Sequence, residues 1–187
     1  MKKILGAIIL FLYPLVGMAA DETAIRSYGN KICTTPTIDT AAYAAGDLIT
    51  PKLTFASAGR YNGNNVTPTG SATGTVQSVL MTDLGAEGKN VELVLFDQNP
   101  SATTFTVNAA FDVADADLVK AVGGAYISVH SAFADNGFSQ ATNLGLSFEI
   151  PEVAGSGYPL YGALVARDAV TYDSASALTI CINVFTD

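Results

Sequence analysis

Val91-Glu92-Leu93-Val94-Leu95-Phe96-Asp97-Gln98-Asn99-Pro100 is the most informative stretch of the chain. Val91, Leu93 and Leu95 fall on one face of an extended backbone, whereas Val94 and Phe96 are apolar on the other. A strand that is apolar on both faces is normally central and covered on both sides. The stretch therefore predicts a central strand in a two-layer fold. The strand should end at the Asp-Gln-Asn-Pro corner, and a second β-prone run should follow at residues 103–105.

The composition also favours an all-β protein. Only 14% of the 187 residues are charged, and short β-prone runs are separated by Gly, Pro, Asn and Asp. We predict a two-sheet antiparallel β-sandwich of jelly-roll type with about eight strands and one short helix; an up-and-down barrel is the alternative. The expected strands cover residues 31–38, part of 48–58, 75–82, 91–96, 125–130, 144–150, 160–167 and 177–185.

Two local features add detail to this prediction. The strand at 75–82 and the central strand are expected to form an antiparallel hairpin joined by a longer loop. Residues 112–122 form the one convincing helical pattern, with Leu118, Ala121 and Val122 on one face. Acidic residues lie early in that segment, Lys120 lies late, and a Gly-Gly pair should end the helix.

The N-terminus resembles a secretory leader. A Met-Lys-Lys start precedes the apolar run 4–16, and Gly17-Met18-Ala19 supplies the small residues of a cleavage site. The apolar run is interrupted by Pro14 and is shorter than the roughly 20 residues that a membrane span needs, which disfavours an anchor. We therefore expect a signal peptide at 1–19, a single β-sandwich domain at 20–187, and export through the inner membrane to the periplasm, the medium or a virion.

The charge balance bears on the partners. The formal net charge is −8, and cleavage of the leader would leave seven basic and seventeen acidic residues, a net charge of −10. A chain of this sign repels nucleic-acid phosphates, and no Lys/Arg stripe counteracts the repulsion. Nucleic-acid binding is therefore not expected, and contact with a membrane is expected only through the leader.

Cys33 and Cys181 are the two cysteines of the chain. In an exported protein an even pair favours a disulfide, although two unpaired thiols are the alternative. The bond would close a loop of about 150 residues and bring the first and last strands together. In the last strand Leu178, Ile180 and Ile182 should face the core, so the disulfide should lie on the outer side of the sheet.

Two sets of side chains could carry chemistry. His130 is the only histidine, but no nucleophile elbow accompanies it, so an ordinary residue at the end of a strand is the better interpretation. Asp112, Asp115 and Asp117 could hold a hard cation, but their spacing lacks the glycine of a calcium loop. Stabilisation of the start of a helix explains these carboxylates better.

Two further pairs have simpler explanations. Asp97 and Asn99 could be metal ligands, although turn residues that bond their own backbone account for them. Glu149 and Glu152 could act as the paired carboxylates of a glycosidase, but they straddle the end of a strand and no aromatic platform accompanies them.

Tyr158, Tyr161 and Tyr172 could form a sugar-stacking face, which the complete lack of Trp disfavours. The chain contains no phosphate-binding glycine loop and no zinc-ligand spacing. We therefore expect no cofactor, no metal site and no catalytic residues, and an enzyme is not supported.

A longer pattern resembles a known family. Residues 35–43, 46–49, 52–55 and 79–83 resemble small virion structural proteins, related to capsid decoration proteins, of tailed bacteriophages and prophages. The similarity is densest at Val94-Leu95-Phe96-Asp97 and at 99–105, continues through 108–111 and 114–118, and spans roughly residues 33–130. The resemblance implies a component of a particle without catalytic activity, and it implies no site residues. One difference is the leader, because tailed-phage capsid proteins assemble in the cytoplasm.

We therefore expect a structural protein of a virus-like particle or another extracellular assembly, such as a capsid, decoration or spike subunit. Its partners would be itself, as a homo-oligomer, or other subunits of the particle. The alternatives are a secreted module that binds a glycan or protein surface, and a subunit of an extracellular filament.

Overall fold

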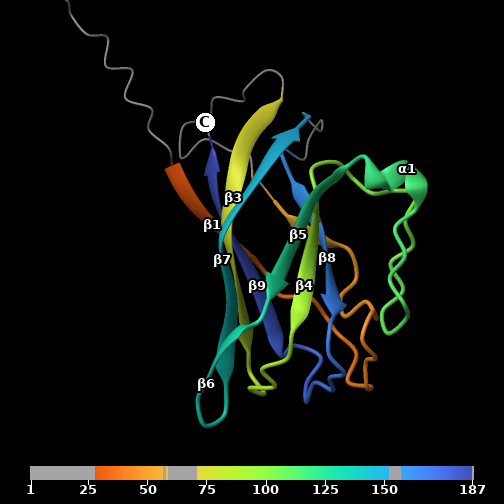
Figure 1. The fold of residues 1–187 in the computed structure, drawn as a ribbon, viewed down its shortest axis with the longest axis vertical. Coiled ribbons are helices and arrows are strands. Elements are labelled where there is room, and N and C mark those ends of the chain that lie inside the picture. Colours follow the sequence, from red (N-terminus) through yellow and green to blue (C-terminus); the bar gives the residue numbers. More distant parts are fainter. Residues whose placement is uncertain (1–27, 57, 59–70, 152–156, 187) are drawn as a thin grey trace, which may run out of the picture.

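The computed structural model describes residues 28–56, 58, 71–151 and 157–186, and these form two antiparallel sheets (Figure 1). The expected signal peptide at 1–19 lies outside the described residues. In sheet order, the five-stranded sheet contains β1 (Tyr28–Thr34), β9 (Leu178–Thr186), β3 (Ala72–Asp83), β7 (Gly137–Ile150) and β6 (Val129–Ala132). The four-stranded sheet contains β2 (Leu53–Phe55), β8 (Leu160–Ala166), β4 (Val91–Phe96) and β5 (Ala121–Ile127).

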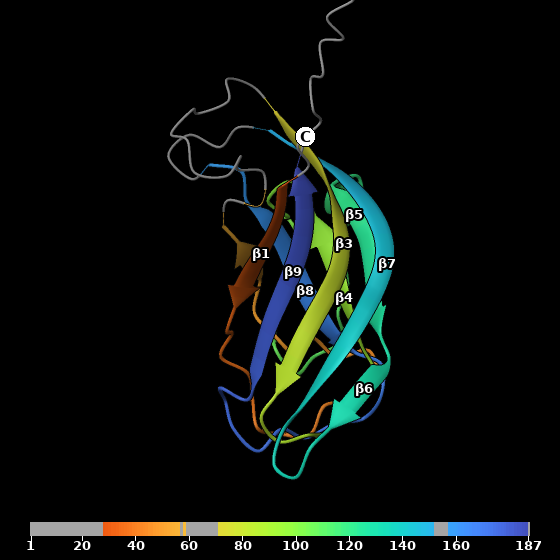
Figure 2. The ribbon, with the colours of Figure 1, turned by 90° about the vertical axis from the view of Figure 1, so that its left-hand side faces the viewer.

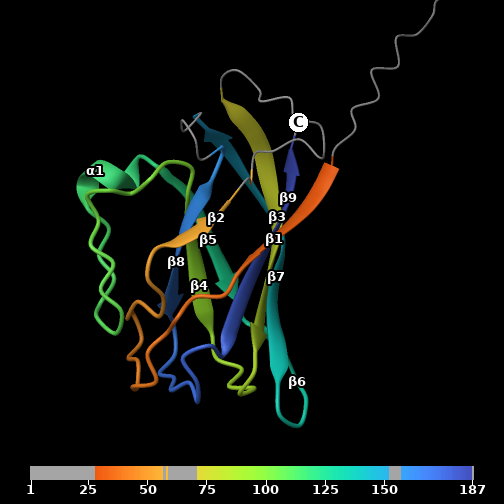
Figure 3. The same ribbon diagram turned by 180° about the vertical axis from the view of Figure 1, so that it is seen from behind.

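The strand order is that of a jelly roll, which confirms the prediction of a β-sandwich and excludes the up-and-down barrel. The chain leaves the five-stranded sheet after β1, β3 and β7 and returns to it after β2, β5 and β8. Figure 2 shows the five-stranded sheet face-on, and Figure 3 shows both layers from behind. β6 is an additional short strand on the outer edge of β7.

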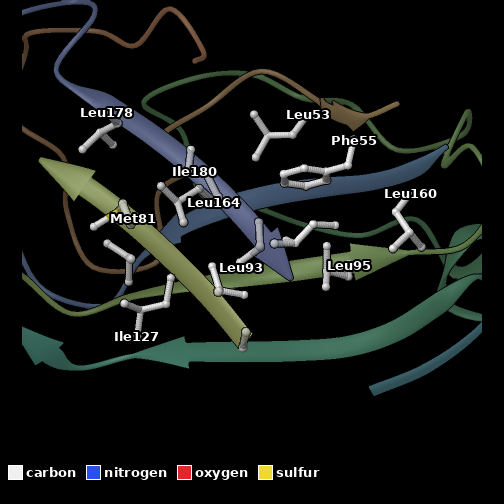
Figure 4. Packing of buried hydrophobic residues seen from close by; sticks show 14 of the residues in the cluster. Leu53, Phe55, Met81, Leu93, Leu95, Ile127, Leu160, Leu164, Leu178 and Ile180 are labelled. Atoms are coloured by element: carbon white, nitrogen blue, oxygen red, sulfur yellow. The ribbon is translucent and has the colours of Figure 1, made fainter. Parts of the chain in front are cut away.

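The core lies between the two sheets and is closely packed, with aliphatic side chains from both layers meeting in the middle (Figure 4). Leu93, Leu95 and Ile127 of one sheet and Met81 and Ile180 of the other are at most 1% exposed. Full burial of each such side chain stabilises the fold by roughly 1.5–3 kcal/mol. The inward-facing apolar positions of the predicted strands therefore form the core.

β4 is a central strand that is covered on both faces, as the sequence predicts. It pairs with β8 on one side and β5 on the other. Its inner residues join the main core, and Val94 on its outer face packs on a second apolar cluster with Phe105 and Phe111. The rings of Phe105 and Phe111 lie 5.7 Å apart, centroid to centroid. This second cluster explains why the strand is apolar on both sides.

Two loops provide the outer cover of the four-stranded sheet. The segment before β2 runs beside β8, with a bridge from Leu48 to Val165, and Pro51 separates this bridge from β2. The loop after β4 reaches the same segment, where the amide of Asn108 donates to the carbonyl of Leu48 at 2.8 Å. The β-prone run at 103–105 is thus part of a loop, residues 99–111, that closes over the sheet.

The predicted helix at 112–122 is wrong in its extent. The helix α1 covers only Asp115–Leu118, and the residues from Ala121 onward belong to β5. Leu118, which the helical pattern placed on a buried face, is 54% exposed, and the buried residue of the helix is Asp117. Gly123, with φ of +146°, lies beside a register shift between β4 and β5, so the Gly-Gly pair forms part of a bulged strand. Among the described residues, no helix is long and apolar enough to cross a membrane.

The predicted hairpin between 75–82 and 91–96 is also wrong. β3 pairs with β7 and β9, whereas β4 lies in the other sheet. The connecting loop changes layers and is held by Asp83, whose carboxylate accepts hydrogen bonds from the amides of Gly85 at 3.0 Å and Glu87 at 2.7 Å. β1 begins and ends earlier than the predicted first strand, at Tyr28–Thr34, and it lies at the edge of its sheet as expected.

Candidate functional site

Asp117 is the centre of the densest polar cluster next to the central strand. Its Oδ2 accepts hydrogen bonds from the amides of Ala102 (2.9 Å) and Thr103 (2.7 Å) and from the Thr103 hydroxyl (2.8 Å). Its Oδ1 pairs with the Lys120 ammonium at 2.6 Å. The Thr103 Oγ1 in turn accepts from the amide of Ala114 at 3.2 Å. These bonds tie the loop after β4 to α1.

The electrostatics of this cluster favour the charged carboxylate. The hydrogen bond from Lys120 is the largest influence and lowers the pKa of Asp117 from 3.8 to about 2, although burial opposes it. Hydrogen bonds from Thr103 and Ala102 add to the lowering of the pKa. Every contact of the carboxylate comes from within the chain, so the cluster has a structural role in positioning the loop.

The structure does not bring together Asp112, Asp115 and Asp117, the aspartates that were considered for a cation site and better explained by a helix start. Asp117 is buried, whereas Asp112 and Asp115 are exposed. No group of three or more His, Cys, Asp or Glu side chains within the described ranges is arranged to hold a metal ion. Asp112 lines an open hollow of about 360 Å³ together with Thr104, Thr106 and Phe111.

Asp97 and Asn99 occupy the corner after β4. The Asn99 Oδ1 accepts from the Lys52 ammonium at 2.7 Å, and the carbonyl of Asn99 accepts from the Lys120 ammonium at 3.0 Å. The Asp97 amide donates to the carbonyl of Lys120 at 3.1 Å, and the buried Asp97 Oδ1 has no hydrogen-bond partner within the described part of the chain, so the side chain does not make the turn bond expected of it. Burial and the nearby Glu149 charge raise the pKa of Asp97. The sequence pattern did not indicate that Asp97 lies near Glu149. Glu152, the other member of the carboxylate pair considered with Glu149, lies outside the described residues.

The three tyrosines do not form the sugar-stacking face that was considered and disfavoured from the sequence. Tyr158 and Tyr172 are 1% exposed and belong to the core. Tyr161 is 9% exposed and lies outside this core cluster, with the Lys52 ammonium 5.5 Å from the centroid of its ring. Tyr172 packs edge-on against Tyr43, and burial is the main reason that its pKa is raised. These side chains offer no open surface on which a sugar ring could stack.

His130 belongs to a hydrogen-bonded line that the sequence did not reveal. Its Nδ1 lies 2.6 Å from the Ser139 hydroxyl, and its Nε2 lies 3.2 Å from the Asn90 Oδ1. The imidazole thus bridges the Ser139 hydroxyl on β7 and the side-chain oxygen of Asn90 in the loop before β4. Ser139 is 1% exposed, and the adjoining cavity of about 10 Å³ has room for about one water molecule. The line fixes β6 against β7 and the β3–β4 loop, and no substrate could reach the serine.

Cys33 and Cys181 form a disulfide, as predicted. The two residues are directly paired across β1 and β9, and their Cα atoms lie 4.0 Å apart. Cys181 lies between Thr179 and Asn183 on the outer side of the strand, opposite the core-facing Ile180. A disulfide of this kind persists in oxidising compartments, which agrees with a location outside the cytoplasm.

An uncharged apolar patch lies on the outer face of the five-stranded sheet, where β6 and β7 project at one end of the sandwich (Figure 2). We call Leu80, Val129, Phe133 and Phe138 the hairpin patch. Val129 and Phe133 are 56% and 61% exposed, and the rings of Phe133 and Phe138 lie 6.1 Å apart. The strand register places Leu80, Gln140 and Val129 in one row across three strands, so Leu80 and Val129 lie on the same face of the sheet on either side of the uncharged Gln140.

The fold and these contacts define the protein as a jelly-roll β-sandwich whose buried polar groups hold its own loops in place. No family model matches the chain, and no curated protein matches it either. The surface therefore carries the functional argument.

Proposed function

We propose that the protein is a non-enzymatic structural subunit that acts by contact with other subunits, in a virus-like particle or another extracellular assembly. The observation that carries the proposal is the hairpin patch. Large apolar side chains that are exposed together on a soluble fold are typical of a protein interface. The polar clusters around Asp117, Asp83 and His130 are already occupied by internal hydrogen bonds.

The location of the patch supports a contact function. The chain is acidic, with a formal net charge of −8, and like-charged surfaces repel one another. The residues of the patch and its neighbours in the register, Thr82, Ser131 and Gln140, carry no charge. A partner can approach here with a smaller electrostatic penalty than over the acidic parts of the surface.

Two further arguments support the class of assembly. The resemblance of residues 33–130 to virion structural proteins of tailed phages points to a particle subunit. The leader-like N-terminus and the Cys33–Cys181 disulfide both favour a site of action outside the cytoplasm. We therefore place the assembled form in the periplasm, in the medium or on a particle.

The test combines two measurements on the full chain, expressed with its own N-terminus. Sedimentation velocity over a wide range of protein concentration should show association, and mass spectrometry should find the protein in particles pelleted from the culture medium. A protein that stays monomeric at every concentration and is absent from the pelleted material would refute the proposal.

A further inference from the structure

We propose that β6 is a self-pairing edge, at which two copies of the chain join antiparallel about a two-fold axis through Ser131. The inference rests on the proposed structural function and names its first contact. The joined sheets would form one continuous sheet across the dimer, and backbone hydrogen bonds of the two edges would be added to side-chain contacts on the outer face.

The edges of the two sheets differ in how strongly they oppose pairing with another chain. Exposed edges invite pairing with other chains, and natural proteins block them with charges, prolines or bulges. β1 carries Lys31, and β2 follows directly on Pro51 and Lys52. β5 is bent by the bulge at Gly123. Each of these three edges thus has a feature that opposes the addition of another strand.

β6 differs from these edges. Its sequence is Val-His-Ser-Ala, without a charged residue or proline, and β7 is its one paired neighbour in the described part of the chain. Its register with β7 is unbroken from Val129 to Ala132. The bonds from His130 to Ser139 and Asn90 hold the strand in place, so little conformational entropy is lost when a partner binds.

The side chains explain why the occupant is a second copy. Val129, Ser131 and Phe133 share the outer face, because their neighbour His130 points inward to the buried Ser139. An antiparallel pairing centred on Ser131 places Val129 of each copy opposite Phe133 of the other. Aliphatic–aromatic pairs directly across a sheet are among the favourable ones. The strand is therefore complementary to itself.

The lack of charge on β6 and its short length are both compatible with pairing to a second copy of the chain. Two copies of an acidic chain meet at the lowest electrostatic cost through uncharged surface, and β6 and the adjoining Phe133 carry no formal charge, while Asp135 lies further along, in the turn before β7. Because β6 has only four residues, backbone hydrogen bonds alone would give a weak contact. The exposed Val129 and Phe133 supply the apolar area that the short edge lacks.

The first test is a cross-link in the full oxidised protein. At a two-fold axis the two Ser131 residues are direct cross-strand neighbours, within the Cα separation that a disulfide needs. Ser131→Cys should give a covalent dimer under mild oxidation. Thr142→Cys, an exposed position on β7 of the same sheet, is the matched control and should remain monomeric on a non-reducing gel.

The second test removes the apolar pair. The Val129→Asp/Phe133→Asp variant places carboxylates at exposed positions, so its fold should be retained, with an unchanged circular dichroism spectrum. We expect the dimer dissociation constant to rise by about 100-fold in sedimentation experiments. The matched Thr142→Asp variant should dimerise like the wild type.

The outcomes separate this inference from the proposed function. An oligomer that survives the double Asp substitution, with no covalent dimer of the Ser131→Cys variant, would overturn β6 pairing and leave the structural function standing. A chain that is monomeric at every concentration would overturn β6 pairing as well, and absence from the pelleted particles would then remove the structural function. The inference is supported if Ser131→Cys forms a covalent dimer, Thr142→Cys does not, and the Val129→Asp/Phe133→Asp variant loses the dimer.

Discussion

Reduction of the Cys33–Cys181 disulfide should destabilise the protein mainly through the unfolded state. β1 is paired with β9 along seven residues, from Tyr28 to Thr34, so the strand is held by its ladder even without the bond. The native structure should therefore survive reduction with little change. The unfolded chain, in contrast, gains the freedom of a very long loop when the bond is broken.

The magnitude follows from the loop length. The two cysteines are 148 residues apart in sequence, so the bond closes nearly the whole of the described chain. The chain-entropy relation for a loop of this length gives about 17 cal/mol/K, or about 5 kcal/mol at 25 °C. Because domains are stable by about 5–15 kcal/mol, reduction should remove a third or more of the free energy of unfolding.

Urea denaturation of the oxidised and the reduced protein, followed by circular dichroism, measures this difference. With a denaturant dependence of about 2 kcal/mol/M, the midpoint should fall by about 2.5 M on reduction. The Cys33→Ala/Cys181→Ala variant is the control for the reducing agent, and its midpoint should not respond to it. Its stability should lie close to that of the reduced protein, with a modest further loss because Cys181 is only 3% exposed.

Two results would refute this reasoning. A loss of stability below about 1 kcal/mol would mean that the unfolded chain already keeps its ends together, so that the bond restricts it little. A changed near-ultraviolet spectrum in the reduced protein at zero urea would mean that the bond holds β1 in the native state, contrary to the ladder argument.

Three further predictions follow from the described contacts. Because the pKa of Asp117 is lowered from 3.8 to about 2, its stabilising contribution should be complete above pH 4 and should be lost as the pH falls toward 2; Asp117→Asn should flatten this part of the urea midpoint profile. Lys120→Met should raise the pKa of Asp117 in a carboxyl NMR titration, whereas Lys52→Met, which removes contacts with Asn99 and the Tyr161 ring but none with Asp117, should leave it unchanged. Gly74→Ala should cost about 1–3 kcal/mol in urea denaturation, because a Cβ at this position would lie 2.6 Å from the ring of Phe148.

The fold class could be predicted because two-residue periodicity reports burial directly. Leu178, Ile180 and Ile182 alternate with more polar residues, and they form the inner face of β9. The stretch around Val94 was informative because apolar residues on both faces require cover on both faces. The disulfide could be predicted from cysteine count and export, and direct cross-strand pairing satisfies it.

Strand pairing and the helix could not be predicted from local pattern. The loop at 83–90 looks like a hairpin connection, yet the Asp83 carboxylate holds it in a path between two sheets. The spacing of Leu118 and Val122 fits a helix, but Asp117 is the buried residue of α1, Leu118 is exposed, and Val122 belongs to β5. No periodicity indicates that one carboxylate of three will be buried, since its partners, Ala102 and Thr103, come from a distant loop.

The described contacts separate the residues that serve folding from those proposed to meet a partner. β4, its corner and the loop that Asp117 ties to α1 serve folding, because a covered central strand needs a loop held in one position above it. Val129 and Phe133 are exposed and take no part in the Asp117 cluster. The edge and outer face of β6 can therefore be changed without disturbing that cluster, which is why the Val129→Asp/Phe133→Asp variant should test contact and leave the fold intact.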